Sequence, residues 1–300
     1  MIDKLTYLLA LAREAHFGRA AESCGITQPT FSAGIRALEE VLDMPLVERS
    51  SRFLGFTPEG ERMLEWARQI VGDVQAMRAD LRALKGGLSG QIRFAVIPTA
   101  LGSVTDLTIP YHAHHPNVRL SIQSCTSNEV LRRLDNFEAD VGITYLDNEP
   151  TGRNRILPLY QERYNLLTAT KTALASRQTI SWAEIGQIPL GLLTSDMQNR
   201  RIINRLLHSA GGGDPPVLES NSLIVLISHA QAGLLSCVLP KALARLLGPQ
   251  SGLKAIPIIA PEETHMVGLL LPERSPVPPL VSALLTIIQN NGLLANGTVQ

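Results

Sequence analysis

Apolar residues recur every three or four positions in three short stretches at the start of the chain, up to about residue 42. Such spacing places apolar side chains on one face of a helix. It predicts helices over about 4–13 and 18–24, and a third helix that begins near Gln28 and is ended by Pro45. Two extended runs, LVERS and FLGFT, then flank Ser51-Arg52 and predict a small β-hairpin.

A much longer helical pattern runs from Pro58 to about Lys85. Proline suits the first turn of a helix, and Thr57 before it suits the N-cap. About 27 helical residues would span ~40 Å, which is long for a globular core and typical of a dimerising arm. The stretch GGLSG, residues 86–90, then breaks the pattern and predicts a flexible hinge.

Beyond residue 90 the pattern changes to short β-rich runs that alternate with helical stretches. The first runs are QIRFAVI, VRLSIQ and ADVGITYL, and the later ones are NLLTAT, PLGLLT, VLES, LLSCVLP and THMVGLLLP. Helical spacing lies between them over about 101–114, 128–137, 197–210 and 223–232, and again over 278–290. Strands that alternate with helices imply a parallel sheet. The order predicts two α/β lobes, with the chain returning to the first lobe near its end.

Composition narrows the function classes. The chain of 300 residues is 45% hydrophobic and 18% charged, which excludes a disordered or fibrous protein. The formal net charge is zero, so any binding to nucleic acid must come from local geometry rather than from a global field. The sequence contains no GxSxG, Walker, HExxH or GxGxxG motif, and the predicted pocket lacks a poised acid–base pair. We therefore expect no enzymatic activity.

The pattern also bears on where the protein resides. The first residues, MIDKLTYLLALAREAHFGRAA, lack the basic region and the clear cleavage site of a signal peptide. The most apolar later stretch, about 223–239, is interrupted by polar residues and is too short for a membrane span. We therefore expect a cytoplasmic protein with no membrane partner, and a solute-binding transport protein is the less favoured class.

The helix that begins near Gln28 presents a small, polar surface that a core does not need. Thr27 is a good N-cap and Pro29 fits the first turn, so helix initiation alone would explain those two residues. The face away from the apolar stripe has the small, hydrogen-bonding side chains that major-groove reading requires. The expected DNA contacts on this helix are Gln28, Thr30, Ser32, Ala33 and Arg36. The hairpin would place Arg49 and Arg52 against the phosphate backbone as a wing.

Together these motifs resemble the winged helix-turn-helix of the LysR-type transcriptional regulators. The likeness lies in FGRAAE (17–22), TQPTFS (27–32), IRALEE (35–40), PLVER (45–49) and TPEG (57–60). The layout of linker helix, hinge and two-lobed sensor, similar to periplasmic binding proteins, also matches the family. The resemblance implies a regulator that binds double-stranded promoter DNA as a homodimer or homotetramer, contacts RNA polymerase, and takes a small-molecule effector but no other cofactor. Arg19, Thr27 and Pro29 join the expected DNA contacts.

One feature departs from the family pattern. Residues 1–57 contain six basic and seven acidic side chains, so a single module should bind DNA modestly and multivalent binding should matter more. The expected domains are a winged helix-turn-helix over 1–58, a linker and dimerisation helix over 59–86, and a two-lobed α/β effector-binding domain over 87–300. Lobe I is expected at about 91–162 and 266–292, and lobe II at about 163–265.

In a two-lobed α/β fold, ligands bind at the carboxyl ends of strands, where helix N-termini point inward. The resemblance places the effector between the lobes. Hydroxyl and backbone N–H groups in these loops favour a small carboxylate or another anion. The expected effector-binding residues are Thr99, Ala100, Ser124, Cys125, Ser127, Thr194, Met197 and Asn221. Ordinary N-capping by Thr99, Ser127 and Ser222 explains these positions equally well.

The chain has three cysteines, too few and too widely spaced for a disulfide framework or a CxxC metal site. Cys125, at a predicted helix N-terminus, could have a lowered pKa and react with oxidants, so a thiol-based redox sensor is the alternative function. Cys237 is expected in a buried apolar strand and Cys24 in a packing role. The run HAHH, residues 112–115, is expected to complement a helix dipole, and no metal site is expected.

Overall fold

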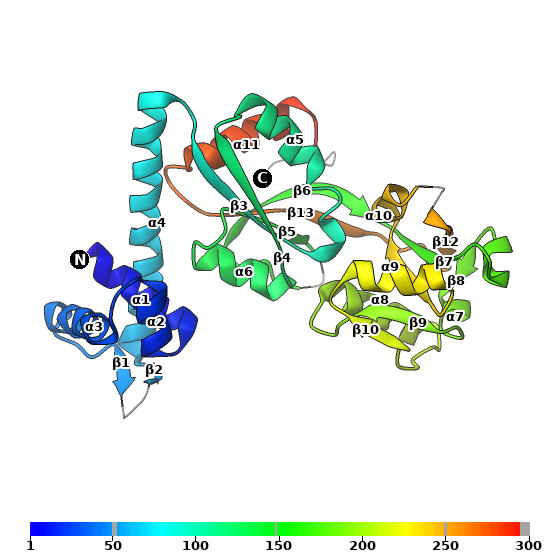
Figure 1. The fold of residues 1–300 in the computed structure, drawn as a ribbon, viewed down its shortest axis with the longest axis horizontal. Coiled ribbons are helices and arrows are strands. Elements are labelled where there is room, and N and C mark those ends of the chain that lie inside the picture. The colour runs from blue at the N-terminus through cyan, green and yellow to red at the C-terminus, as the bar shows by residue number, and fades with distance from the viewer. Residues whose placement is uncertain (50–52, 148, 249–250, 295–300) are drawn as a thin grey trace. The chain divides into compact units, whose positions relative to one another are not determined.

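The computed structural model describes residues 1–49, 53–147, 149–248 and 251–294. The chain forms two compact units (Figure 1). The first consists of residues 1–87 with two short segments, 135–137 and 274–279, and the second contains the remainder of the chain. Among the described residues, no helix combines the length and the apolar character needed to cross a membrane.

The first unit begins with three short helices. They are α1 (Ile2–Glu14), α2 (Phe17–Ser23) and α3 (Gln28–Leu42). Their apolar stripes meet in one core whose members include Leu5, Leu8, Phe31, Ile35 and Leu38, all fully buried. The predicted helices are therefore confirmed. The helix stops before the predicted end at Pro45: its last residue is Leu42, and the C-cap Asp43 adopts the left-handed conformation at φ 54°.

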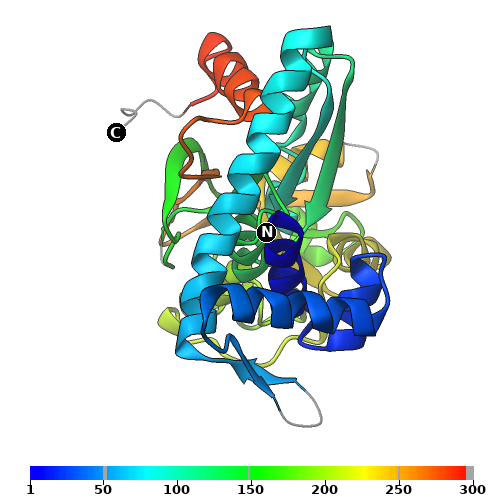
Figure 2. The same ribbon diagram turned by 90° about the vertical axis from the view of Figure 1, so that its left-hand side faces the viewer.

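A hairpin and a long helix complete this unit. Strands β1 (Val47–Arg49) and β2 (Phe53–Phe56) pair antiparallel, as predicted, and α4 runs from Pro58 to Gly86. Thr57 caps α4, because its Oγ1 accepts a hydrogen bond from the Gly60 amide at 3.0 Å. Figure 2 shows α3 lying crosswise to α4, with the hairpin extending beyond the helices.

The first sheet of the second unit has the order β4-β3-β5-β13-β6. Its strands are β3 (Gly90–Val96), β4 (Val118–Ser124), β5 (Val141–Tyr145), β6 (Asn154–Glu162) and β13 (His265–Pro272). The helices α5 (Thr105–His114) and α11 (Pro279–Asn290) lie on one side of this sheet, and α6 (Ser127–Asp135) lies on the other (Figure 1). A short 3-10 helix, Pro98–Ala100, follows β3. We call this part lobe I.

The second sheet has the order β10-β9-β11-β7-β12-β8. Its strands are β7 (Tyr164–Ala169), β8 (Ile180–Ser181), β9 (Leu190–Leu193), β10 (Leu218–Ser220), β11 (Ser236–Pro240) and β12 (Leu253–Ile259). The connecting helices are α7 (Trp182–Ile185), α8 (Gln198–Ser209), α9 (Leu223–Ala232) and α10 (Lys241–Leu246), with a 3-10 helix at Ala173–Ser176. We call this part lobe II.

Both sheets are mixed, so the prediction of parallel sheets is only partly right. Strands β3, β4 and β5 are parallel, but β13 runs antiparallel to both β5 and β6. In lobe II, β9 pairs parallel with β10 and β11, whereas β7 pairs antiparallel with β11 and β12. The antiparallel pairs arise because the chain enters lobe II directly from β6 and returns directly into β13, without a crossover helix.

The two passages between the lobes are short. Only Arg163 separates the end of β6 from the start of β7, and residues 260–264 separate β12 from β13. We call residues 160–164 and 260–265 the crossing segments. They position the faces of the two lobes that carry the candidate effector site.

Candidate DNA-reading helix and effector cleft

The start of α3 is built as a capped, exposed helix end. Thr27 lies in an extended conformation, and its Oγ1 accepts a hydrogen bond from the Thr30 amide at 3.5 Å and contacts the Thr30 hydroxyl at 2.9 Å. Gln28 and Pro29 are exposed on the first turn. The predicted cap is confirmed, and Gln28 and Pro29 beside it do not pack into the core.

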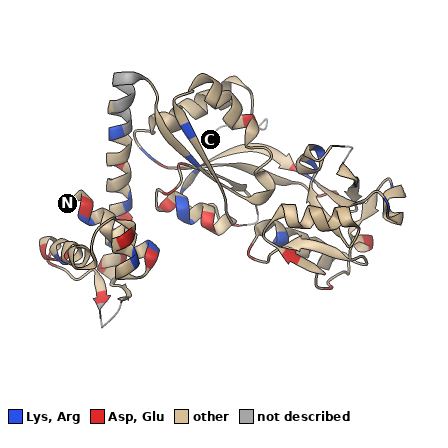
Figure 3. Ribbon diagram, viewed as in Figure 1, with Lys and Arg blue, Asp and Glu red and all other residues tan. Residues whose placement is uncertain are grey.

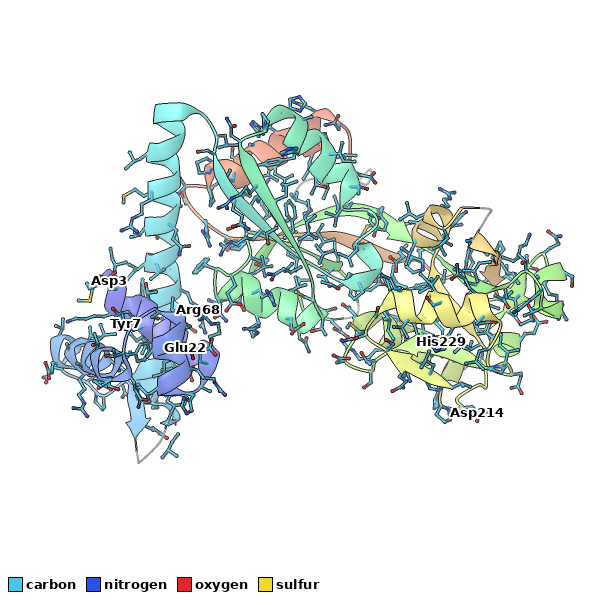
Figure 4. All side chains as sticks on the ribbon, in the orientation of Figure 1. Asp3, Tyr7, Glu22, Arg68, Asp214 and His229 are labelled. Atoms are coloured by element: carbon cyan, nitrogen blue, oxygen red, sulfur yellow. The ribbon has the colours of Figure 1, made fainter. Side chains whose placement is uncertain are left out.

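The buried side of α3 fixes the direction of the exposed side. Phe31 is fully buried, with its ring 5.3 Å from that of Tyr7 on α1 and 6.1 Å from that of Phe17 on α2. Gly34 faces Tyr7, which Figure 4 labels, so closely that a β-carbon would approach the ring within 2.7 Å. Gly25, at φ 69°, lies in the turn before α3, and the Ile26 amide closes this turn by donating to the Ala21 carbonyl. The helix-turn-helix geometry follows from these contacts.

The structure brings most of the expected DNA contacts onto this surface. Thr30, Ala33 and Arg36 are exposed on α3, and Ser32 is half-buried. Arg19 on α2 is 64% exposed and donates to the Glu14 carbonyl at 2.6 Å. Arg52 lies outside the described residues, and Arg49 is placed only by its backbone in β1. Its role in a wing, like that of Arg52, stays a prediction.

The charges of the first unit are mixed rather than basic. Figure 3 shows acidic and basic positions interspersed along its helices. Glu14, for instance, lies between Arg13 and Arg19, with Arg13 Nε 2.9 Å from its Oε1. An array of neutral donors with few cations relies on close groove contact more than on long-range attraction.

A cleft with a volume of about 770 Å³ opens between the faces of lobes I and II. Its floor and walls come from the loops after β3, β4, β9 and β10, at the carboxyl ends of these strands, where ligands bind in open α/β sheets. The lining residues are Pro98, Leu101, Ser124, Cys125, Thr126, Glu129, Asp196, Met197, Asn221, Ser222, Leu223 and Ile224.

Four of the eight expected effector residues line this cleft, namely Ser124, Cys125, Met197 and Asn221. The other four are not among its described lining residues. Thr99 and Ala100 are buried, and the Thr99 hydroxyl contacts that of Tyr145 at 3.2 Å. Ser127 donates to Gln198 Oε1 at 2.8 Å, which ties the start of α6 to the start of α8. Thr194 precedes Met197 without being part of the described lining.

The capping assignments need correction. The N-cap of α6 is Thr126 rather than Ser127: its Oγ1 accepts from the Glu129 amide at 3.2 Å, and Glu129 Oε2 accepts from the Thr126 amide at 2.9 Å. This reciprocal pair is a capping box, and the sequence TSNE carries its signature. Thr99 is no cap, since its hydroxyl is used inside lobe I. Ser222 stands at the N-cap of α9 as expected, but makes no side-chain cap bond.

The described lining of the cleft is negatively charged, which the expectation of an anionic effector did not include. Glu129 and Asp196 contribute two carboxylates, and none of the described lining residues is basic. The nearest arginines of lobe II are already paired: Arg200 with Glu219 at 2.7 Å, and Arg201 with Glu149 at 2.6 Å and with the Asp196 carbonyl at 2.8 Å. The starts of α8 and α9 lack a side-chain cap, and the first two residues of α9, Leu223 and Ile224, line the cleft.

The cysteines differ from the expectation in one respect. Cys125 lines the cleft but is only 2% exposed, and burial raises the pKa of its thiol, so the predicted lowering is wrong. The start of α6 is capped by Thr126 and Glu129 and not by Cys125. Cys237 is fully buried in β11, as expected, and burial raises the pKa of its thiol to about 12. Cys24 packs at the edge of the first core, and burial raises its pKa as well.

A buried polar cluster at the crossing segments was missed entirely. Glu162, at the end of β6, is 2% exposed and accepts a hydrogen bond from the Tyr145 hydroxyl. Asn199 of α8 donates to the same hydroxyl at 3.1 Å, and the Tyr164 hydroxyl lies 3.4 Å from it. His265 is buried beside these rings, with Nδ1 2.6 Å from Asp147. Burial raises the pKa of Glu162 to about 8, although the phenols of Tyr145 and Tyr164 partly offset this effect.

Comparison with known proteins agrees with this architecture. Residues 2–61 match the bacterial regulatory helix-turn-helix protein, lysR family, and residues 85–292 match the LysR substrate binding domain. The chain is 28% identical over 277 residues to the DNA-binding transcriptional dual regulator OxyR of Escherichia coli, covering 92% of this chain and 90% of that protein. It is 28% identical over 305 residues to the regulator IlvR of Caulobacter vibrioides, covering 97% and 98%.

Two solved structures show the same fold. A full-length OxyR variant from Pseudomonas aeruginosa superposes with a TM-score of 0.73 at 25% identity, covering 96% of this chain and 97% of that one. The regulator CbnR in complex with its target DNA superposes with a TM-score of 0.62 at 20% identity, covering 97% and 99%. With a helix-turn-helix match at its start and a LysR sensor match over most of the remainder, the chain belongs to the LysR family of transcriptional regulators.

Proposed function

We propose that this regulator couples the occupancy of its inter-lobe cleft by a small polar metabolite to the binding of promoter DNA by α3. The observation that carries the proposal is the cleft itself, which is formed by both lobes at the carboxyl ends of their strands. A ligand that touches both lobes has a different affinity for different lobe arrangements. That difference is the thermodynamic requirement for a regulatory response.

The effector fits best as a small carboxylate that also bears a positive group. The uncapped start of α9, where Leu223 and Ile224 line the cleft, favours a carboxylate. Glu129 and Asp196 repel a purely anionic ligand and attract an ammonium group. Hydroxyl groups of Ser124 and Ser222, together with the apolar Leu223 and Ile224, suit a short chain between the two charged ends. An amino acid or a close derivative meets all of these conditions.

Thermal unfolding of the full chain with matched ligand sets tests this assignment. Each set contains an α-amino acid, the same acid without its amine, and the same amine without its carboxylate. We expect the amino acid to raise the melting temperature most. Asp196→Asn should reduce the shift, and the exposed Asp214→Asn, whose site Figure 4 labels, serves as control. If none of the compounds stabilises the protein, the assignment of the effector class fails.

At the DNA, we propose that Gln28, Thr30, Ser32 and Arg36 read base edges while Arg19, Arg49 and Arg52 hold phosphates. Gln suits adenine and Arg suits guanine in the major groove. The exposed apolar side chains of α4 support pairing of subunits through this helix: Trp66, Ile70, Met77 and Leu81 are between 37% and 54% exposed. Two such dimers would form the tetramer, with RNA polymerase as a further partner, and no catalytic turnover is proposed.

A thiol-based response is the second candidate function. What favours it is that relatives such as one from Dickeya chrysanthemi, 27% identical, are named hydrogen peroxide-inducible genes activators. The burial and raised pKa of Cys125 disfavour it, because the thiolate is the reactive form. Peroxide treatment separates the two candidates: a change in DNA binding that Cys125→Ser abolishes would establish redox sensing.

A further inference from the structure

The carboxyl group of Glu162 occupies an unusual place in the molecule. It lies at the last residue of β6, where the chain leaves lobe I, and it is 2% exposed. Its Oε1 accepts from the Tyr145 hydroxyl, whereas Oε2 is buried without a hydrogen-bond partner among the described residues. A carboxylate left in this condition would be costly, since each lone pair would lose its water without replacement.

No cation is among the described groups that shift the pKa of Glu162. The phenols of Tyr145 and Tyr164 lie beside Glu162, and the charge that shifts its pKa is that of Asp147, which has the same sign. Burial and the carboxyl group keep the pKa of both phenols well above 10, so they stay protonated donors. The adjacent Arg163 points outward to Glu262. The geometry therefore favours a neutral carboxylic acid.

The remaining titratable groups around Glu162 lie on β6, β13, α5 and α10 and in the segments that follow β5, β6 and β12. His265 on β13 is its partner in the β6–β13 register, and its Nδ1 and Nε2 lie 2.6 Å from Asp147 and 3.7 Å from Glu263. Tyr160 precedes it by two residues on β6, and burial raises the pKa of that phenol. Four further charged groups line the same pocket as Glu162, namely Asp106 of α5, Arg163, and Lys241 and Arg245 of α10. A test must separate Glu162 from these groups.

The cluster joins the parts that would move if the lobes rearranged. Tyr145, the partner of Glu162, also contacts Thr99 behind the cleft and Asn199 in lobe II. Gln198, next to Asn199, donates to the Asp147 carbonyl at 3.0 Å and accepts from Ser127. Both crossing segments and both lobes therefore meet at one buried network, in which Oε2 of Glu162 and Oδ1 of Asp147 are buried without a hydrogen-bond partner among the described residues.

We propose that Glu162 is a proton-linked hinge group, neutral while the lobes hold the described arrangement and ionised when the crossing segments loosen and water reaches it. The proton is released to solvent, so the reaction is balanced by one proton per subunit. This inference rests on the proposed function in one respect, namely that the effector acts through the arrangement of the lobes.

The sign of the coupling follows from the two ionisation states. In the buried state the pKa of Glu162 is about 8, and in the hydrated state it returns toward its ordinary value of 4.5. Between these two pKa values, loosening of the crossing segments releases a proton. The equilibrium constant for loosening therefore rises by up to about tenfold per pH unit in this range and levels off at higher pH. An effector that favours the described arrangement would bind more tightly at lower pH by the same factor.

Amide hydrogen exchange of the full chain, corrected for the intrinsic effect of pH, tests the inference without an effector. In the wild type, we expect the equilibrium constant for opening of the crossing segments to be higher at pH 8 than at pH 6, by a factor of up to about a hundred. Glu162→Gln, which keeps the shape of the neutral acid, should abolish that dependence. Glu262→Gln, a change of an exposed carboxylate beside the same crossing, should retain it.

Infrared spectroscopy supplies an independent readout should Glu162→Gln fail to fold. The carbonyl stretch of a protonated carboxylic acid should persist in the wild type at pH 6.5 and disappear with a midpoint near the pKa of about 8. Tyr145→Phe removes a donor to the carboxyl group and should move that midpoint upward. The absence of the band at pH 6.5, or an exchange profile in Glu162→Gln that keeps the dependence of the wild type, would overturn the inference. Failure of every effector candidate would leave both readouts unaffected.

Discussion

The carbonyl oxygen of Leu46 lies where a side chain on Gly60 would begin: a β-carbon at Gly60 would stand 2.0 Å from it. Leu46 precedes the hairpin and Gly60 lies in the first turn of α4, so this contact joins the wing to the linker helix. It explains physically why the TPEG motif ends in glycine, since any other residue would push the two backbones apart.

Replacement of Gly60 by alanine should therefore destabilise the DNA-binding unit. Overpacking against a side chain costs about 1–3 kcal/mol, and here the obstacle is backbone, so we expect the upper part of that range. Chemical denaturation and promoter binding by the full chain measure the effect. The control is Gly55→Ala, because a β-carbon at Gly55 meets nothing within 4 Å. Equal stability of the two variants would contradict the role of the contact.

Thr57 holds the same junction through its hydroxyl group. It donates to the Pro45 carbonyl at 2.7 Å and accepts from the Gly60 amide at 3.0 Å. Thr57→Ala should lower the free energy of unfolding by about 1–2 kcal/mol, because it removes a helix cap and a tertiary bond together. Thr57→Ser keeps the hydroxyl and should restore most of the loss; if it behaves like alanine, the methyl group and not the hydrogen bonds would be responsible.

Gln28 and Arg52 should affect DNA binding in different ways. Loss of the Gln28 side chain should cost about 1–3 kcal/mol on the preferred promoter site and little on random DNA, since a base-edge contact carries sequence information. Arg52→Ala should weaken binding to every sequence and lower the salt slope by about one. Titrations of both variants on specific and random duplexes at several salt concentrations make the comparison. Equal losses on both kinds of DNA would remove the distinction.

The three thiols should react slowly in the folded protein. Burial raises the pKa of Cys24, Cys125 and Cys237, and only the thiolate attacks an alkylating reagent. We expect alkylation of native chain at pH 7 to be at least about tenfold slower than that of unfolded chain. Mass spectrometry after timed alkylation resolves each cysteine. Rapid modification of native Cys125 would instead support the redox candidate.

The sequence was sufficient where a local pattern decides the structure. The helix over 223–232 was predicted with the bounds that α9 has, and the caps at Thr27 and Thr57 were both found. Strand β6 was missed because Pro158 interrupts it. The strand tolerates this proline because it lies at the edge of its sheet, opposite Gly268 at an irregularity of the register.

The candidate site was less predictable, because burial is a property of the fold. Thr99 and Cys125 occupy the expected loops, but packing turns the Thr99 hydroxyl toward Tyr145 and removes the Cys125 thiol from water. Glu162, in the polar run QERYN, has the sequence pattern of a solvent-exposed acid. Only the passage of β6 into β7 places it between two lobes, and no spacing rule along the chain contains that information.

The stability of the whole protein should depend on pH because Glu162 is buried. Its folded pKa of about 8 exceeds the ordinary value of 4.5, so the folded state holds the proton more tightly than the unfolded state. The stabilisation is complete below pH 4.5 and declines as the pH rises through that window, by at most ~1.4 kcal/mol per pH unit. Denaturation of wild type and Glu162→Gln at pH 5.5 and 8.5 measures it. We expect the free energy of unfolding of the wild type to fall by a few kcal/mol between these pH values. Glu162→Gln should not show this fall, because glutamine carries no proton to lose. If both proteins lose the same stability, other groups must account for it, and the carboxyl group of Glu162 would have to be hydrated in the native state.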